Sequence, residues 1–160
     1  MKTKLSLLNL VLIVLGCSKI WNDGPSGIKV YGSWVVTSYH DLTNDSIIEK
    51  KDVDSWGMDV KIKFMRDSTF CGFCTNNEIA GHYTLADSCF NIDVYGGSKV
   101  GQPEWGDLFS DIALSHSFTC YKRNNKELRL YYDDNNKYVL LNLLDTDIRC
   151  TITYSSPSDP

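Results

Sequence analysis

The chain has 160 residues, of which 42% are hydrophobic and 22% are charged, and its formal net charge at pH 7 is −4. This length suits a single domain with a hydrophobic core. The acidic balance argues against nucleic acid as a partner, because nucleic-acid-binding proteins usually present a basic patch and none is evident in the sequence.

A short secretory signal is predicted at the N-terminus. Lys2 and Lys4 precede the apolar run Leu5–Leu15 (LSLLNLVLIVL), and the small residue Gly16 follows it. As a helix this run covers roughly 16 Å at about 1.5 Å per residue, whereas a bilayer core is about 30 Å thick. A charged start, a short apolar stretch and a small residue before the cleavage point are typical of a signal peptide. We therefore expect residues 1–16 to be removed.

Cys17 directly follows this segment. The sequence Val14-Leu15-Gly16-Cys17 resembles the lipobox of bacterial lipoproteins, in which the cysteine receives a diacylglyceryl thioether and becomes the new N-terminus. The resemblance implies lipid attachment at Cys17 and the membrane as a partner, since stable anchoring takes more than one acyl chain. Residues 17–27 would then form a tether. No acidic run follows the cysteine, so the expected location is the outer membrane, facing the periplasm. An ordinary secretory signal before an incidental cysteine is the alternative.

Alternation of apolar and polar residues with a period of two predicts a single β-rich domain over residues 28–154. In Met58–Phe64 (MDVKIKF) every second residue is apolar, and Phe90–Tyr95 and Glu127–Leu130 repeat the pattern. Clusters of Asn and Asp between such runs favour tight turns. The predicted strands are 32–39, 58–64, 69–74, 79–85, 89–95, 117–122, 127–132, 137–144 and 148–154, and residues 155–160 form a tail.

Two segments depart from this rhythm. Residues 40–56 form a polar connection of unusual length, which predicts a functional or mobile loop. In Trp105–Ser115 the apolar residues recur at helical spacing, which predicts a short helix that caps one end of the sheet. Strands joined by tight turns make an antiparallel meander, and closure of the meander removes exposed edges. The expected fold is mainly β, with eight to nine antiparallel strands closing into a small barrel-like sheet and one short helix near 105–115.

The central segment KFMRDSTFCGFCTNNEIAGHYTL contains two predicted strands, an asparagine-rich turn and the motif Gly81-x-Tyr83, and ELRLYY follows later. This order resembles the META domain of heat-shock-linked bacterial lipoproteins over roughly residues 30–144. The resemblance implies a small envelope β-domain and supplies no catalytic residues. Asn76-Asn77 stands where that family has Cys-Asn. The strand order is also similar to that of the lipocalin-like lipoproteins of gut bacteria.

The predicted domain contains five cysteines, so at least one stays free or pairs between chains, or all remain reduced. Cys71 and Cys74 form a C-x-x-C motif like that of thiol–disulfide oxidoreductases, but those enzymes place the first cysteine at a helix N-terminus. Here the motif ends a predicted strand, where residues three apart lie on opposite faces, so we expect a structural role. The candidates for a disulfide or a free thiol are Cys71, Cys74, Cys89, Cys120 and Cys150.

The sequence predicts no catalytic, metal or cofactor site. Only one pair of cysteines is close in sequence, whereas four-cysteine zinc sites usually have two close pairs. His40, His82 and His116 show no ligand spacing, and the Gly-x-Ser-x-Gly nucleophile motif is absent. We therefore expect no cofactor and no enzymatic activity.

Aromatic residues provide one candidate binding site. Tyr95, Tyr131 and Trp105 are predicted to line a cleft beside the helix, although inward-facing aromatic side chains also simply fill a core. The leading hypothesis is a lipid-anchored envelope β-domain that binds an unknown protein or small ligand, or supports the envelope, without catalysis. The alternatives are a lipocalin-like carrier with a small apolar ligand inside the barrel, and a periplasmic thiol oxidoreductase that uses Cys71 and Cys74.

Overall fold

The computed structural model describes residues 30–50, 59–87, 89–98, 100–101 and 103–152. The predicted signal segment 1–16, Cys17, the tether 17–27 and the tail 155–160 lie outside the described residues. No helix in the described part of the chain is long and apolar enough to span a bilayer.

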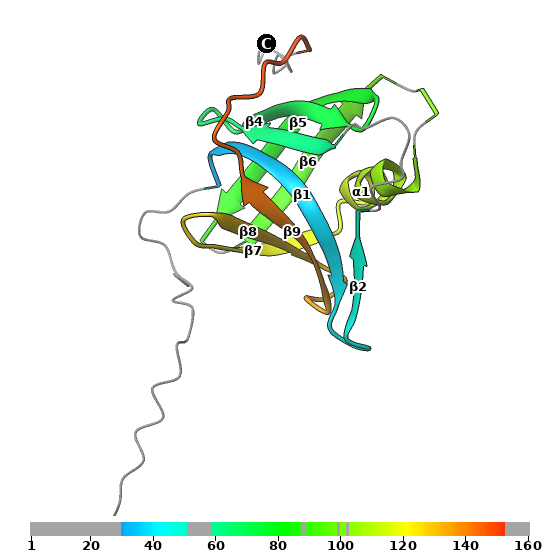
Figure 1. Cartoon of the computed structure of the whole chain (residues 1–160). Helices are drawn as coiled ribbons and strands as arrows, with labels where there is room; N and C mark the ends of the chain where they lie inside the picture. Colours follow the sequence, from blue (N-terminus) through cyan, green and yellow to red (C-terminus); the bar gives the residue numbers. More distant parts are fainter. Residues whose placement is uncertain (1–29, 51–58, 88, 99, 102, 153–160) are drawn as a thin grey trace, which may run out of the picture.

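The described residues form one antiparallel sheet of nine strands and one short helix, α1 (Glu104–Leu114), which confirms the predicted fold class (Figure 1). The sheet order is β2-β1-β3-β4-β5-β6-β7-β8-β9, and an additional pairing of β1 with β9 makes the sheet ring-like. The strands are β1 (Gly32–Asp41), β2 (Ser46–Glu49), β3 (Val60–Phe64), β4 (Thr69–Cys74), β5 (Asn77–Ala86), β6 (Cys89–Gly97), β7 (Phe118–Arg123), β8 (Glu127–Tyr132) and β9 (Lys137–Leu143).

Strand β1 is central to the closure of the ring. One edge of β1 pairs with β9 along most of its length. The other edge is shared, because Gly32–Val35 pair with β3 and Ser38–Asp41 pair with β2. Strand β2 therefore lies at the end of the sheet order, as an extra strand beside the ring.

The strand β2 corrects the prediction of a loop over residues 40–56. It has four residues, and all of them are exposed. A strand exposed on both faces shows no alternation of apolar and polar residues, so the sequence pattern did not indicate it. The turn before it is fixed by side chains, since Asp41 Oδ1 accepts hydrogen bonds from Thr43 N–H at 2.9 Å and Asn44 Oδ1 accepts one from Ser46 N–H at 3.0 Å.

The predicted strand 148–154 is wrong, because its described residues 148–152 form no strand. The preceding strand, β9, already has β8 on one edge and β1 on the other, so no neighbouring edge remains to pair with. Other contacts hold the segment in place. Ile148 N–H donates a hydrogen bond to Ser33 Oγ at 3.1 Å, and Cys150 forms a disulfide with Cys71 in β4.

Large apolar side chains fill the inside of the ring. The alternating residues of β3, Val60, Ile62 and Phe64, are fully buried as the sequence predicted. The Phe64 ring meets the rings of Tyr83 and Phe90 edge to face, with centroids 5.1 and 5.5 Å apart. The buried residues of α1, among them Phe109, Ile112 and Ala113, join the same core. The helix therefore covers the core at one end of the ring, as predicted.

Candidate functional site

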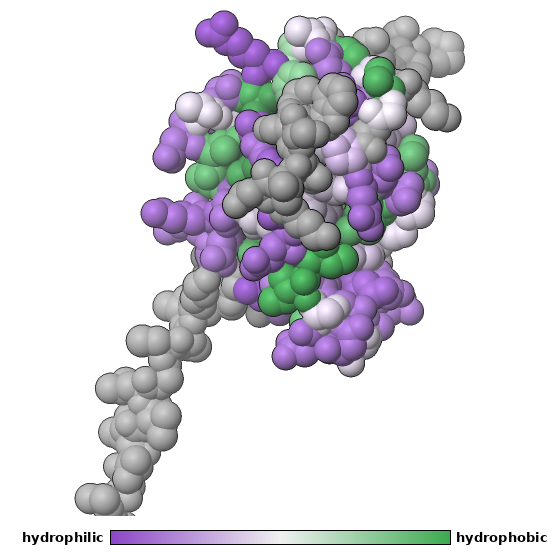
Figure 2. All heavy atoms as spheres, turned by 45° about the vertical axis from the view of Figure 1, so that its right-hand side comes forward, coloured by the Kyte–Doolittle hydropathy of each residue, from purple (hydrophilic) through white to green (hydrophobic). Residues whose placement is uncertain are grey.

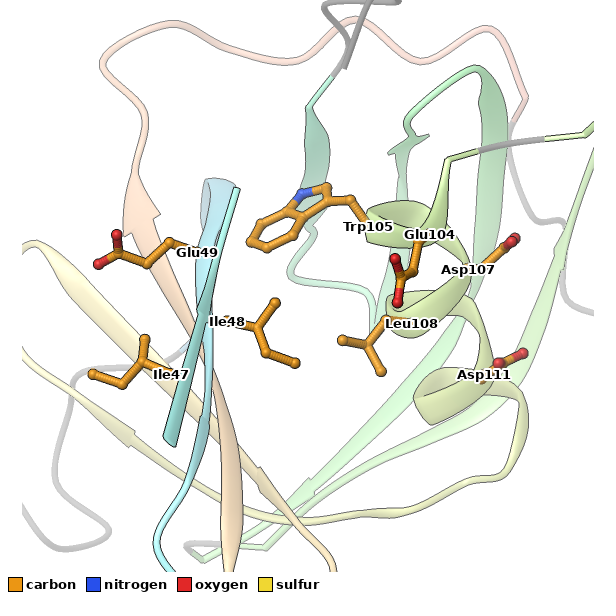
Figure 3. Close-up of a pocket in the computed structure, with 8 residues that line it drawn as sticks. All are labelled: Ile47, Ile48, Glu49, Glu104, Trp105, Asp107, Leu108 and Asp111. Carbon is orange, nitrogen blue, oxygen red and sulfur yellow. The ribbon is translucent and has the colours of Figure 1, made fainter. Parts of the chain in front are cut away.

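A groove lies between α1 and β2 and has a volume of about 700 Å³. We call it the α1–β2 groove; it is lined by Ile47, Ile48, Glu49, Glu104, Trp105, Asp107, Leu108 and Asp111. Ile48 from β2 and Leu108 from α1 point toward one another across the groove, and the indole of Trp105 reaches from α1 toward β2 (Figure 3). This side of the molecule shows hydrophobic surface among hydrophilic side chains (Figure 2).

The β2 side of the groove exposes two large apolar side chains. Ile47 is 53% exposed and Ile48 is 54% exposed, although isoleucine is among the residues most often fully buried. Strand β2 is the last strand in the sheet order, so one of its edges has no partner strand among the described residues. An exposed strand edge presents free N–H and C=O groups that can pair with another extended chain.

Trp105 fixes the helix against the ring. The Trp105 carbonyl accepts a hydrogen bond from Tyr39 Oη at 3.0 Å, and the two rings meet edge to face with centroids 4.8 Å apart. Burial raises the pKa of the Tyr39 hydroxyl well above its ordinary value, so this donor stays protonated. The indole is only 6% exposed, and its buried Nε1–H has no hydrogen-bond partner among the described residues. Leaving a buried donor unpaired costs about 1–3 kcal/mol.

The rim of the groove is acidic. Glu104, Asp107 and Asp111 follow one another on α1 at spacings of three and four residues, so they lie along one side of the helix. Glu49 adds a fourth carboxylate from β2, and the described lining includes no Lys, Arg or His. Carboxylates in the first turn of a helix stabilise it, but Asp111 stands in the last turn, where the helix dipole disfavours negative charge. Stabilisation of the helix therefore does not explain the positions of all the carboxylates at the rim.

A second groove lies between α1 and strands β5 and β6, with a volume of about 890 Å³, and it shares Asp107 and Asp111 with the α1–β2 groove. Tyr95 lines it, and its hydroxyl forms a hydrogen bond with Ser110 Oγ at 3.0 Å. Burial raises the pKa of Tyr95. This contact, like those of Trp105, attaches α1 to the sheet.

The three aromatic residues predicted to share a cleft do not come together. Trp105 and Tyr95 line different grooves beside α1. Tyr131 packs instead against Tyr138 of β9, with ring centroids 5.4 Å apart. The reason is the period of the strand: Leu128 and Leu130 are fully buried, so Tyr131 next to Leu130 points to the outer face.

The two cysteines of the C-x-x-C motif have different bonding partners. Cys71 forms a disulfide with Cys150, with the two Cα atoms 6.0 Å apart. Cys74 is a buried free thiol that donates a hydrogen bond to the Gly106 carbonyl in α1 at 3.0 Å. Burial raises the pKa of the Cys74 thiol, which is the opposite of what a reactive cysteine needs.

The other two predicted candidates, Cys89 and Cys120, are also free thiols, and they stand opposite one another on β6 and β7. Among the described residues, no group of three or more His, Cys, Asp or Glu side chains could hold a metal ion.

The sequence indicates Trp105 as a groove residue but not most of the α1–β2 groove. Ile47, Ile48 and Glu49 lie in the predicted loop 40–56, and the carboxylates of α1 look like ordinary solvated residues in the sequence. The one available signal was the pair of isoleucines in the polar segment 40–56.

No family model matches the chain, and no curated protein matches it. Two solved structures are similar. A protein from Burkholderia xenovorans, determined by NMR, is 16% identical with a TM-score of 0.56, and the match covers 72% of this chain and 83% of that one. A DUF4847 family protein from Bacteroides vulgatus, determined by crystallography, is 17% identical with a TM-score of 0.52, and the match covers 72% of this chain and 94% of that one. At these identities the likeness shows the fold alone, and the META and lipocalin-like resemblances stay predictions.

Proposed function

We propose that this protein is a lipid-anchored, non-catalytic binding protein of the bacterial envelope, and that its α1–β2 groove holds a basic peptide segment in an extended conformation. The observation that carries the proposal is the composition of the groove. In the described part of the chain it combines a strand edge with no partner strand, exposed isoleucines and a rim of carboxylates in one place.

Each of these features favours the same class of ligand. An extended peptide can add to the free edge of β2 through main-chain hydrogen bonds. Its apolar side chains would cover Ile48 and Leu108, and its Lys or Arg side chains would face the carboxylates of α1. Complementary charge of this kind supports specificity and fast association.

The two alternative functions receive no such support. A carrier needs space inside the ring, but the fully buried rings of Phe64, Tyr83 and Phe90 contact one another there. A thiol oxidoreductase needs a reactive cysteine pair, whereas Cys71 is bonded to Cys150 and Cys74 is buried.

The proposal is tested by titrating the protein with a fluorescent peptide in which Lys alternates with Val, and with the same peptide carrying Glu in place of Lys. We expect only the Lys peptide to bind, with an affinity that falls as salt is added. The triple variant Glu104→Gln, Asp107→Asn, Asp111→Asn should bind about tenfold more weakly, since each exposed ion pair contributes roughly 0.2–1 kcal/mol.

The matched control removes three exposed carboxylates elsewhere, by Asp87→Asn, Asp134→Asn and Asp145→Asn. This control has the same net charge as the groove variant and should bind like the wild type. An equal loss in both triple variants would mean that overall charge, not the groove, attracts the peptide. Failure of the wild type to bind either peptide would reject the proposal.

A further inference from the structure

Strands β6 and β7 meet at a pair of cysteines. Cys89 and Cys120 stand directly opposite one another, and they are the single registered pair between these two strands in the described part of the chain. Both are free thiols; Cys89 is exposed and Cys120 is half-exposed. Every other neighbouring pair of strands shares at least four registered pairs.

The register places the two sulfur atoms on the same side of the sheet. Residues directly opposite one another on antiparallel strands have Cα atoms about 4.5 or 5.5 Å apart, and a disulfide needs Cα atoms about 4.4–6.8 Å apart. Phe90, next to Cys89, is fully buried, so Cys89 points outward. Cys120 stands opposite the outward-facing Tyr131 on its other side. The two thiols can therefore bond with little movement of the backbone.

A weak hydrogen bond holds the Cys120 thiol in its present position. Cys120 Sγ donates a hydrogen bond to Asn135 Oδ1 at 3.0 Å. The same oxygen accepts a hydrogen bond from Thr119 Oγ1 at 2.8 Å, so Asn135 keeps a partner when the sulfur turns away.

We propose that Cys89 and Cys120 form a second disulfide by exchange with a disulfide oxidant, either a small-molecule disulfide or the disulfide of a thiol oxidase. The Cys89 thiolate attacks one sulfur of the oxidant, which forms a mixed disulfide and releases the first oxidant thiol. The Cys120 thiolate then attacks the Cys89 sulfur and releases the second. The protein loses two electrons and two protons, and the oxidant is reduced to two thiols.

The order of these steps follows from accessibility. Cys89 is exposed and can reach the oxidant first. Burial raises the pKa of the Cys120 thiol, so Cys120 is less often a thiolate and is a poor first nucleophile toward the oxidant. With Cys71–Cys150, the new bond would use four of the five domain cysteines and leave only Cys74, which is buried.

The bond would stabilise the ring at its least paired junction. The chain between Cys89 and Cys120 contains the whole of α1, so the disulfide would close a loop around the helix that carries the groove carboxylates. Closing a loop of this size removes conformational entropy from the unfolded chain. The pairing does not depend on peptide binding and can be tested separately from it.

The test is to incubate the purified full chain with oxidised glutathione, block free thiols with N-ethylmaleimide, and map the peptides without reduction. We expect a Cys89–Cys120 cross-linked peptide beside the Cys71–Cys150 one. The oxidised wild type should melt about 5–15 °C above Cys89→Ser treated in the same way, because both keep Cys71–Cys150 and differ in the second disulfide.

Three results would overturn the proposal. Cys89 and Cys120 could both carry maleimide while Cys71–Cys150 is intact, Cys89 could retain glutathione with Cys120 free, or the oxidised protein could form dimers linked through Cys89. Peptide mapping of the wild type decides between these results even if Cys89→Ser is unstable. The variant Cys120→Ser provides a second comparison and should show the same lower melting temperature.

Discussion

At the scale of single residues, two tryptophans show how burial of the same group can have different consequences. Trp34 and Trp105 are both buried. Trp34 Nε1–H donates a hydrogen bond to the Val30 carbonyl at 2.8 Å, and the Arg123 guanidinium lies 4.7 Å from the centre of the Trp34 ring. Trp105 Nε1–H has no partner in the described part of the chain. The Trp34 donor therefore contributes a hydrogen bond to the fold, whereas the buried Trp105 donor contributes none that the structure describes.

We therefore predict that Trp34→Phe and Trp105→Phe differ in their effect on the free energy of unfolding, measured by urea titration. Trp34→Phe removes the buried hydrogen bond to the Val30 carbonyl, so it should destabilise the protein by at least about 1–3 kcal/mol. Trp105→Phe removes an unpaired donor, which offsets the loss of ring volume, and should change stability by less than about 1 kcal/mol.

The same two variants also bear on ligand binding. Trp105 lines the α1–β2 groove, and a smaller ring offers a peptide less contact, so the Trp105→Phe variant should bind the Lys–Val peptide more weakly while its stability is nearly unchanged. Equal destabilisation by both substitutions would contradict this expectation, because it would show that the Trp105 N–H contributes to the free energy of unfolding.

At the scale of elements, the close approach of neighbouring strands depends on a glycine in the Gly81-x-Tyr83 motif. A Cβ atom at Gly81 in β5 would collide with the Val94 carbonyl of β6 and would lie 2.7 Å from the Phe70 ring. At Gly96 in β6, two residues after Val94, a Cβ would meet nothing within 4 Å. Gly81-x-Tyr83 resembles a motif of the META domain, and packing of the sheet alone accounts for its glycine.

Gly81→Ala should therefore destabilise the protein by about 1–3 kcal/mol or more, since the backbone of β6 must move to accommodate the methyl group. Gly96→Ala is the matched control on the neighbouring strand and should change stability by less than about 0.5 kcal/mol. Thermal unfolding of both variants measures the difference. Similar melting temperatures for the two would contradict the tight packing of β5 against β6.

The elements also show what the sequence could predict. Strands with one buried face, such as β3, can be predicted from the alternation of apolar and polar residues, and the helix can be predicted from the spacing of its apolar residues. Strand β2 has no buried face, so it lacks this alternation. Residues 148–152 do alternate, but they have no neighbouring strand edge to pair with. The pairing of Cys71 with Cys150 and the meeting of α1 with β2 depend on the closed ring, which brings together segments far apart in the sequence. The groove was therefore mostly unpredictable, although Trp105 was identified.

At the scale of the whole molecule, several contacts bind the segment after β9 to the ring. Cys150 is bonded to Cys71, and Asp147 accepts hydrogen bonds from Ser33 Oγ at 2.9 Å and Lys63 Nζ at 2.5 Å. These hydrogen bonds hold the pKa of Asp147 below its ordinary value. A disulfide between residues 79 apart in the chain is typical of proteins that fold outside the cytosol. This agrees with the export that the N-terminal sequence predicts.

Anchoring through Cys17 leads to a prediction for the intact protein. Denaturing mass spectrometry of protein extracted from its own membranes should show a chain without residues 1–16, with added acyl mass and with the Cys71–Cys150 bond. Cys17→Ser cannot form the thioether, so it should lose the acyl mass and leave the membrane fraction. The control Cys74→Ser changes another cysteine and should stay anchored. An acyl-free wild-type chain that begins elsewhere would reject the lipid anchor. Peptide binding at the α1–β2 groove would be unaffected by that result, because the peptide titration tests it separately.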